Sequence, residues 1–198
     1  LKIGDWIGIP KYNIEGNIQD INLLTTKIVN FDKTISTIPT YDLLSTEIRN
    51  HQVMYEGSSR RIKRSIYFNI KSFKFVDDEF YEKVKDINLI SEYLDRKLRE
   101  IAESKKNIPH AERIINGQQL TNIGLFRNYV LNYLKNNPKV DQDEIVLVRQ
   151  LEISPQGMPL EIYCFANKAE LVDYERIQAD IFDHILTAAQ EFDLEIMQ

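Results

Sequence analysis

The segment NFDKTISTIPTYDLLS, residues 30–45, is the most informative part of the chain for the fold. It predicts the end of one strand, a tight turn at Asp32-Lys33 and a second strand over 34–38. Pro39 then ends that strand, because proline lacks an N–H and pushes the preceding residue towards extended geometry. We therefore expect a short β-hairpin that leaves its sheet by a sharp, rigid exit.

The residues before this hairpin also have a β pattern. A first strand is predicted over 3–9 and is ended by Pro10. The segment 17–29 is rich in β-branched residues and predicts one long strand with a bend near Leu24-Thr25. Several short strands with closely spaced turn signals predict a small barrel or curled sheet over residues 1–58.

The pattern changes at residue 59. A strand is predicted from Arg60, with Ile62, Ile66, Phe68 and Ile70 on one face, and helices follow with Asp77 and Asn88 as candidate caps. A further helix, a β-hairpin, an amphipathic helix and a last strand complete the order. Without one extra helix this is the split βαβ, ferredoxin-like pattern. We predict an α+β protein with a β-barrel domain over 1–58 and a ferredoxin-like α/β domain over 59–198, with a helical insertion at about 107–140.

Composition is that of an ordinary globular protein, with 43% hydrophobic and 28% charged residues and a net charge of −5. Residues 49–75 are basic and the last third is acidic, which indicates either two surfaces with different roles or simply solvated charged faces. The single cysteine, Cys164, excludes an internal disulfide and is interpreted as a buried thiol rather than a nucleophile. No window resembles a membrane span. Because the chain starts at Leu1, we expect a processed terminus or a piece of a longer protein.

The sequence offers no catalytic constellation. The glycines form no phosphate-binding motif, and His51, His110 and His184 lie far apart without metal-ligand spacing. Asp77 and Asp78 at a helix start serve capping and the helix dipole. We therefore predict no enzyme, no cofactor and no metal site.

The segment RRIKRS, residues 60–65, is the best candidate for a binding patch. On a strand, Arg61 and Lys63 would share one face, with Arg60 and Arg64 on the other. Such a patch suits phosphates of lipid or nucleic acid, or it is only a charged strand start at a domain boundary. The RNA interpretation lacks the interleaved aromatic residues of a stacking platform. Two interpretations of Trp6 also remain: it is either a core residue of the barrel or an anchor at a membrane interface.

Two segments together carry a family resemblance. GDWIGIP, residues 4–10, and GNIQDINLLTTKIVNFDKTISTIPT, residues 16–40, resemble the cytoplasmic β-domain signature of the small-conductance mechanosensitive channel (MscS) family. The matching signature positions are Gly4, Asp5, Gly16, Thr25, Thr26, Asp32 and Pro39. Thr40 stands where the family usually has asparagine. This variant, with NIGLFRNYVLNYLKNNP, MPLEIYCFAN and QADIFDHIL, resembles the miniconductance, YbdG-like branch.

The resemblance implies a function for the chain. It implies an Sm-like β-domain and an α/β vestibule below transmembrane helices that precede Leu1. The parent would be a homoheptamer in the bacterial inner (plasma) membrane, with this part on the cytoplasmic side. It would open under tension during hypo-osmotic shock and release ions and small solutes. Its partners would be itself, membrane lipids through the missing region and permeating ions, with no nucleic acid expected.

In this setting the basic residues Arg60, Arg61, Lys63 and Arg64 are candidates to face lipid headgroups or the vestibule entrance. The alternative hypothesis is a soluble Sm-like RNA-binding ring protein. A phosphate-handling enzyme built on the ferredoxin-like half is a third possibility, but no residues in the sequence identify its site.

Overall fold

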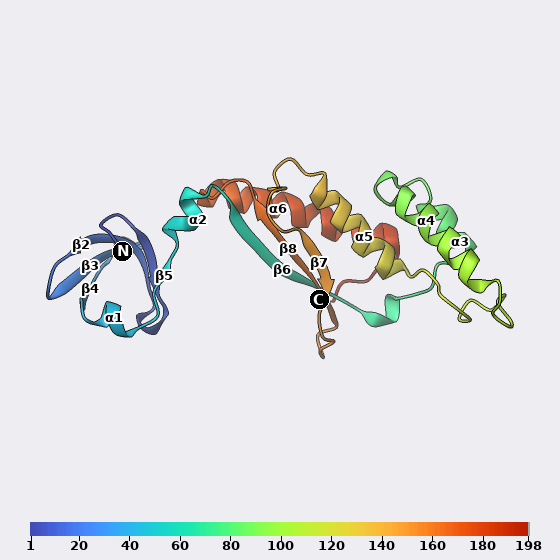
Figure 1. Cartoon of the computed structure of the whole chain (residues 1–198), viewed down its shortest axis with the longest axis horizontal. Helices are drawn as coiled ribbons and strands as arrows, with labels where there is room; N and C mark the ends of the chain where they lie inside the picture. The colour runs from blue at the N-terminus through green and yellow to red at the C-terminus, as the bar shows by residue number, and fades with distance from the viewer. Residues whose placement is uncertain (198) are drawn as a thin grey trace. The chain divides into compact units, whose positions relative to one another are not determined.

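The computed structural model describes residues 1–197. The chain divides into two compact units, residues 1–59 and a second unit that begins at Arg60 (Figure 1). Each unit has its own buried hydrophobic core, and each is described by itself below.

The first unit is a curled five-stranded antiparallel sheet with strand order β4-β3-β2-β1-β5 (Figure 1). The strands are β1 (Trp6–Ile9), β2 (Ile14–Ile21), β3 (Thr25–Asn30), β4 (Ile35–Pro39) and β5 (Arg49–Asn50), with short helices η1 (Pro10–Tyr12), α1 (Asp42–Ser45) and α2 (Gln52–Glu56). The core of this unit is built from β-branched side chains, which suit a pleated and half-buried surface. Its buried members are Ile7, Ile9, Ile14, Ile18, Ile28 and Ile38. This agrees with the predicted small β-domain and hairpin.

The predicted long bent strand over 17–29 is instead two strands joined by a turn. The Asn22 side-chain oxygen accepts hydrogen bonds from the backbone N–H groups of Leu24 and Thr25, at 3.0 and 2.8 Å. An asparagine that bonds to the backbone two residues ahead mimics a turn, so the chain reverses there. β2 and β3 then pair antiparallel, with a β-bulge between Ile18 and Asp20.

The second unit contains a three-stranded antiparallel sheet with order β6-β8-β7. Its strands are β6 (Arg60–Phe68), β7 (Leu147–Gln150) and β8 (Met158–Ala166). Ile196 forms a single antiparallel bridge to Phe68 at the free edge of β6, where the last strand was expected. The spatial order of these four segments is that of a ferredoxin-like sheet, so the α+β prediction is confirmed.

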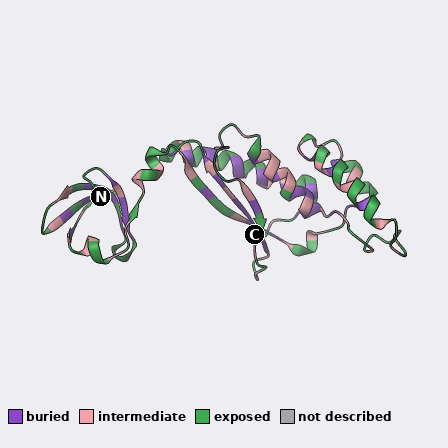
Figure 2. Cartoon of the chain, in the orientation of Figure 1, coloured by how far each residue is buried: buried purple, intermediate pink, exposed green. Residues whose placement is uncertain are grey.

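Helices cover one face of this sheet (Figure 1). The helices of the whole unit are η2 (Ile70–Ser72), α3 (Asp78–Val84), α4 (Asn88–Lys105), α5 (Asn122–Lys135), α6 (Leu171–Ala188) and η3 (Ala189–Phe192). α6 packs on β6 and β8, α5 packs on β7 and η3, and α4 packs on α5. Figure 2 shows the buried residues concentrated in the strands and in the helix faces turned towards them.

The position of the added helical layer differs from the predicted insertion at about 107–140. That range contains α5, whose Phe126, Val130 and Leu134 are fully buried in the sheet core. The helices that lie beyond α5, away from the sheet, are α3 and α4 (Figure 1). Both α4 and α5 carry an apolar stripe at helical spacing, so periodicity alone does not say which of the two packs on the strands.

Helix starts follow local capping chemistry where a cap is present. The Asp77 carboxylate accepts from the Phe80 N–H at 2.8 Å, as predicted, and Thr121 caps α5 through the Gly124 N–H. α4 instead begins at Asn88 itself, and its preceding residue Ile87 provides no side-chain cap. Among residues 1–197, no helix combines the length and the apolar character needed to span a membrane.

Candidate functional site

The Gly4-Asp5 pair of the family signature fixes the start of the first sheet. Gly4 has φ of +94°, a conformation that favours glycine. The Asp5 carboxylate is buried, and it accepts from the Lys2 N–H at 3.1 Å and from the Asn50 side-chain amide at 3.2 Å. The carboxylate therefore ties the first residues to strand β5, which gives this signature position a structural role.

Gly16 lies where β2 and β3 approach too closely for a side chain. A Cβ at this position would be 2.1 Å from the Val29 carbonyl oxygen, far inside van der Waals contact. At the other end of the β2–β3 ladder, Thr26 is fully buried, and its hydroxyl lies 3.0 Å from the Thr40 hydroxyl. Thr40 also donates to the Asn22 carbonyl at 2.7 Å, so the residue that departs from the family pattern holds two hairpins together.

The remaining signature residues shape the β3–β4 hairpin. Asp32 accepts from the Thr34 hydroxyl at 2.6 Å and from its N–H at 3.0 Å, and these hydrogen bonds hold the pKa of Asp32 below its ordinary value. Thr25 pairs with Pro39, the last residue of β4. Lys33 has φ of +69°, as a tight turn requires.

Trp6 packs within the first unit against other rings. Its ring centre lies 5.3 Å from that of Phe31 and 4.9 Å from that of His51. The side chain is half-buried and lies outside the isoleucine core. Trp6 is therefore part of an aromatic cluster at the side of the barrel.

Strand β6 directs two of its four predicted basic residues towards helix α6. Arg60 and Arg64 share the face of the strand that carries the core residue Ile62. The Arg60 guanidinium lies 4.5 Å from the ring centre of Tyr174, and that of Arg64 lies 4.4 Å from Phe182. Such cation–π contacts attach the helix to the strand.

The other two basic residues lie on the opposite face of β6, which none of the described helices of this unit covers (Figure 1). The Arg61 guanidinium is 5.9 Å from the ring centre of Tyr163, and Lys63 Nζ is 3.9 Å from a Glu161 oxygen. Arg60, Arg61, Lys63 and Arg64 therefore do not form one patch. Their role towards lipid or vestibule stays a prediction.

Glu161 is the centre of this open face of the sheet. Its residue surface is only 5% exposed, although it projects from the face without helices. Arg149 donates to the same Glu161 oxygen through Nε at 2.9 Å and Nη2 at 2.7 Å, and Lys63 lies beside the other oxygen. A buried carboxylate needs such partners to offset its desolvation. The face thus presents a neutralised acid ringed by cationic and aromatic side chains.

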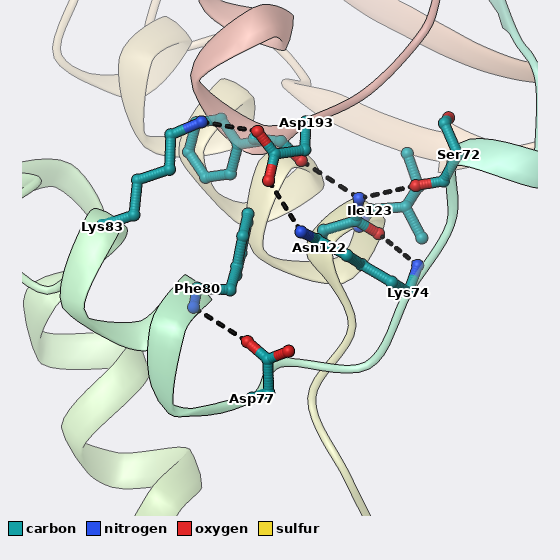
Figure 3. Close-up of polar contacts among 9 residues, drawn as sticks. Ser72, Lys74, Asp77, Phe80, Lys83, Asn122, Ile123 and Asp193 are labelled. Carbon is teal, nitrogen blue, oxygen red and sulfur yellow. Dashed lines mark hydrogen bonds and ion pairs between the residues drawn. The ribbon is translucent and has the colours of Figure 1, made fainter.

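A polar cluster joins three distant segments of the second unit (Figure 3). The fully buried Asn122 side chain accepts from the Lys74 N–H at 3.0 Å and donates to the carbonyls of Ser72 and Phe192, at 2.9 and 3.0 Å. Each of its polar atoms is satisfied, as burial requires. We call Asn122 with these three backbone partners the Asn122 clamp.

Asp193 lies beside the clamp and binds two lysines. Lys74 Nζ and Lys83 Nζ lie 2.7 and 2.5 Å from its two oxygens, and these bonds hold the pKa of Asp193 below its ordinary value (Figure 3). Lys83 belongs to α3, so the ion pairs attach the added helical layer to the end of η3. Sequence reasoning missed this cluster, since its members are separated by up to 119 residues.

The histidine and cysteine residues considered as candidate reactive groups can be compared with their surroundings in the structure. Within residues 1–197, His, Cys, Asp and Glu form no group able to hold a metal ion. Cys164 is fully buried, and burial raises the pKa of its thiol to about 12, so it is not a nucleophile at neutral pH. His184 stacks on Tyr133 with ring centres 4.1 Å apart and hydrogen-bonds the Tyr129 hydroxyl, which accounts for it as a packing residue.

Both units match models of one class of membrane protein. The β-domain of mechanosensitive ion channels matches residues 1–53, and the C-terminal domain of the mechanosensitive ion channel MscS matches residues 78–196. The chain therefore belongs to the MscS family of mechanosensitive ion channels, which are channels and not enzymes.

Curated relatives extend this assignment. The low conductance mechanosensitive channel YnaI of Escherichia coli (strain K12) is 24% identical over 188 residues, which cover 95% of this chain and 40% of the relative. An uncharacterized MscS family protein of Aquifex aeolicus (strain VF5) is 33% identical over 70 residues, 35% of this chain and 17% of the relative. The chain thus spans less than half the length of these relatives. The miniconductance, YbdG-like branch stays a prediction.

Solved structures show the same fold. Arabidopsis thaliana MSL1 aligns over 100% of this chain and 53% of its own, with a TM-score of 0.60 and 15% identity. Helicobacter pylori MscS in a closed state aligns over 100% and 56%, with a TM-score of 0.55 and 14% identity. At these identities the comparison supports the two-unit fold alone.

Proposed function

We propose that this chain is the cytoplasmic vestibule region of a channel that opens under membrane tension and releases ions and small solutes during hypo-osmotic shock. The observation that carries the proposal is the match of two MscS-family domain models, in order, to the two units. Residues 1–58 are then its Sm-like β-domain and residues 59–198 its α/β domain. The soluble RNA-binding ring is not favoured, because both matches are to channel domains.

We further propose that the parent protein is a homo-oligomer, a heptamer by family resemblance, in the bacterial inner membrane with this part on the cytoplasmic side. The first sheet supports assembly because β4 and β5 are its edges, and exposed edges are commonly covered by a neighbour. A ring with one interface repeated around an axis would cover both edges of each copy.

The channel proposal is tested by patch clamp of the full-length parent in reconstituted membranes. We expect currents that rise with membrane tension. A variant of the parent protein that lacks residues 60–198 serves as the comparison, because it has no vestibule domain. Silence of the full-length protein up to lytic tension contradicts the proposal. Saturable, salt-dependent binding of single-stranded RNA by the isolated chain would instead support the alternative.

We also propose that Arg61 and Lys63 are the basic residues that face the vestibule entrance or lipid headgroups, since Arg60 and Arg64 contact rings of α6. Charge reversal by Arg61→Glu with Lys63→Glu is then expected to change conductance or ion selectivity. Arg64→Gln is the matched control, because it alters the packing against Phe182 without changing the open face. Unaltered conductance, selectivity and threshold in the double variant contradict this role.

A further inference from the structure

The turn between β2 and β3 projects two large apolar side chains into solvent. Leu23 is 92% exposed and Leu24 is 77% exposed, although exposed leucines are usually scattered singly over a protein surface. Both lie at the point where the chain reverses, and neither contributes to the isoleucine core of the first unit. Their hydrophobic surface has no partner within the described residues of this unit.

The turn is held rigidly from both sides. Asn22 accepts from the backbone of Leu24 and Thr25, and its own N–H donates to the Thr25 carbonyl at 3.0 Å. The Thr40 N–H donates to the Leu24 carbonyl at 3.0 Å, and the Thr40 hydroxyl donates to the Asn22 carbonyl. The two leucines are therefore presented by a preorganised turn, and ordering them costs little when they bind.

Other exposed apolar residues lie at the same end of the sheet. Because β1 and β2 are antiparallel, residues 1–5 lie beside the end of β2, and the Gly4 N–H donates to the Ile18 carbonyl at 2.8 Å. Ile3 is exposed there, and the exposed Tyr41 directly follows Thr40. An aromatic residue with a polar hydroxyl beside leucines is typical of segments that sit at a membrane–water interface.

Charge at this end is compatible with a lipid surface. Asp20 pairs with Lys27 across the β2–β3 ladder, so the two charges nearest the turn oppose each other. Lys2 adds a positive charge on the neighbouring segment, and Asp5 is buried rather than presented outward. No uncompensated acid among these residues would repel an anionic headgroup region.

We propose that the Leu23-Leu24 turn inserts into the headgroup–acyl boundary of a lipid bilayer and anchors the β-domain to the membrane surface. This inference rests on the proposed channel function in one respect, because it requires a lipid bilayer next to the β-domain. The two leucines project from a convex turn. Such a turn can insert into fluid acyl chains, whereas binding to a protein would require a pocket of matching shape. Membership of a membrane-channel family supplies the membrane as the neighbouring phase.

The test places a nitroxide label on the 198-residue chain at Leu24→Cys. The native Cys164 is fully buried and does not compete for the label. Vesicles of phosphatidylcholine and phosphatidylglycerol at three to one are added, and electron paramagnetic resonance saturation compares access of oxygen with access of a water-soluble nickel chelate. We expect oxygen access at position 24 to rise and chelate access to fall when vesicles are present.

The matched control is Ile35→Cys, an exposed apolar residue of the β3–β4 hairpin at the opposite end of the sheet. Its label is expected to stay in water. Co-sedimentation gives the second readout, in which Leu23→Ser with Leu24→Ser lowers the vesicle partition coefficient about tenfold or more. Ile35→Ser leaves that coefficient unchanged, and Trp6 fluorescence verifies that each variant is folded.

Three outcomes would overturn the inference. In the first, the label at position 24 stays in water although the protein is bound to vesicles. In the second, the chain does not bind vesicles. In the third, the chain self-associates without lipid, and the double serine variant abolishes that self-association. The last outcome would make a second copy of the chain the partner. Full-length channels that carry tension-activated currents while position 24 stays in water overturn this inference alone. Membrane-inserted label without any current overturns the proposed function alone.

Discussion

Replacing Asn122 by alanine removes a buried side chain that makes three hydrogen bonds to distant backbone groups, the Lys74 N–H and the carbonyls of Ser72 and Phe192. A net contribution of about 1 kcal/mol for each bond gives a loss of about 3 kcal/mol in the free energy of unfolding of the second unit. With a urea dependence of roughly 2 kcal/mol per molar, the unfolding midpoint falls by about 1.5 M.

The two units can be followed separately in one urea titration. The only tryptophan, Trp6, lies in the first unit, whereas the long helices lie in the second, so fluorescence and far-ultraviolet circular dichroism report on different units. Asn122→Ala is expected to lower the dichroism midpoint and to leave the fluorescence midpoint unchanged. Asn136→Ala, at the exposed end of the same helix, is the control and changes stability by less than about 0.5 kcal/mol.

The reasoning would be refuted by a dichroism midpoint that moves no further in Asn122→Ala than in Asn136→Ala. Equal shifts in the fluorescence and dichroism midpoints would also refute it, since the clamp has no partner in the first unit. A change in the slope of the transition would indicate an altered unfolded state rather than a lost bond.

Two further predictions concern other parts of the chain. Gly16→Ala introduces a Cβ where the facing Val29 carbonyl leaves no room, so unfolding of the first unit, followed by Trp6 fluorescence, should occur at a lower urea concentration. The dichroism midpoint, which reports on the second unit, should not change. Equal fluorescence midpoints for wild type and variant would contradict the close approach of β2 and β3. Asp193 has a folded-state pKa below its ordinary value of 3.8, so its ion pairs stabilise the fold above that pH and this contribution is lost as the pH falls through the lowered pKa. The stability difference between wild type and Asp193→Asn, measured by urea titration between pH 7 and pH 3, should therefore shrink towards acid, and a difference that grows would disprove the assignment.

Local periodicity predicted much of the fold. The alternation of Ile62, Ile66 and Phe68 located β6 and its buried face, and the predicted order of elements included the amphipathic helix that is α6. The Asp32-Lys33 turn and the stop at Pro39 followed from backbone chemistry that acts within a few residues. These features share one property: the residues that cause them are neighbours along the chain.

The features that sequence reasoning missed depend on partners far along the chain. Leu23 and Leu24 have the composition of a strand interior, and the Asn22 side chain that reverses the chain there gives only a weak signal. α4 and α5 each carry an apolar stripe, and only the tertiary packing shows that α5 is the one that lies against the strands. Asn122 resembles an ordinary polar residue at a helix start until Ser72 and Phe192 are brought beside it.

The Asn122 clamp also bears on the order in which the chain is completed during synthesis. Ser72 and Lys74 leave the ribosome before Asn122, but Phe192 follows it by 70 residues. Until the segment around Phe192 emerges, one amide hydrogen of Asn122 lacks its native acceptor, and the start of α5 cannot be fully buried without cost. The second unit is therefore expected to remain loosely packed during synthesis until the segment around Phe192 has emerged from the ribosome.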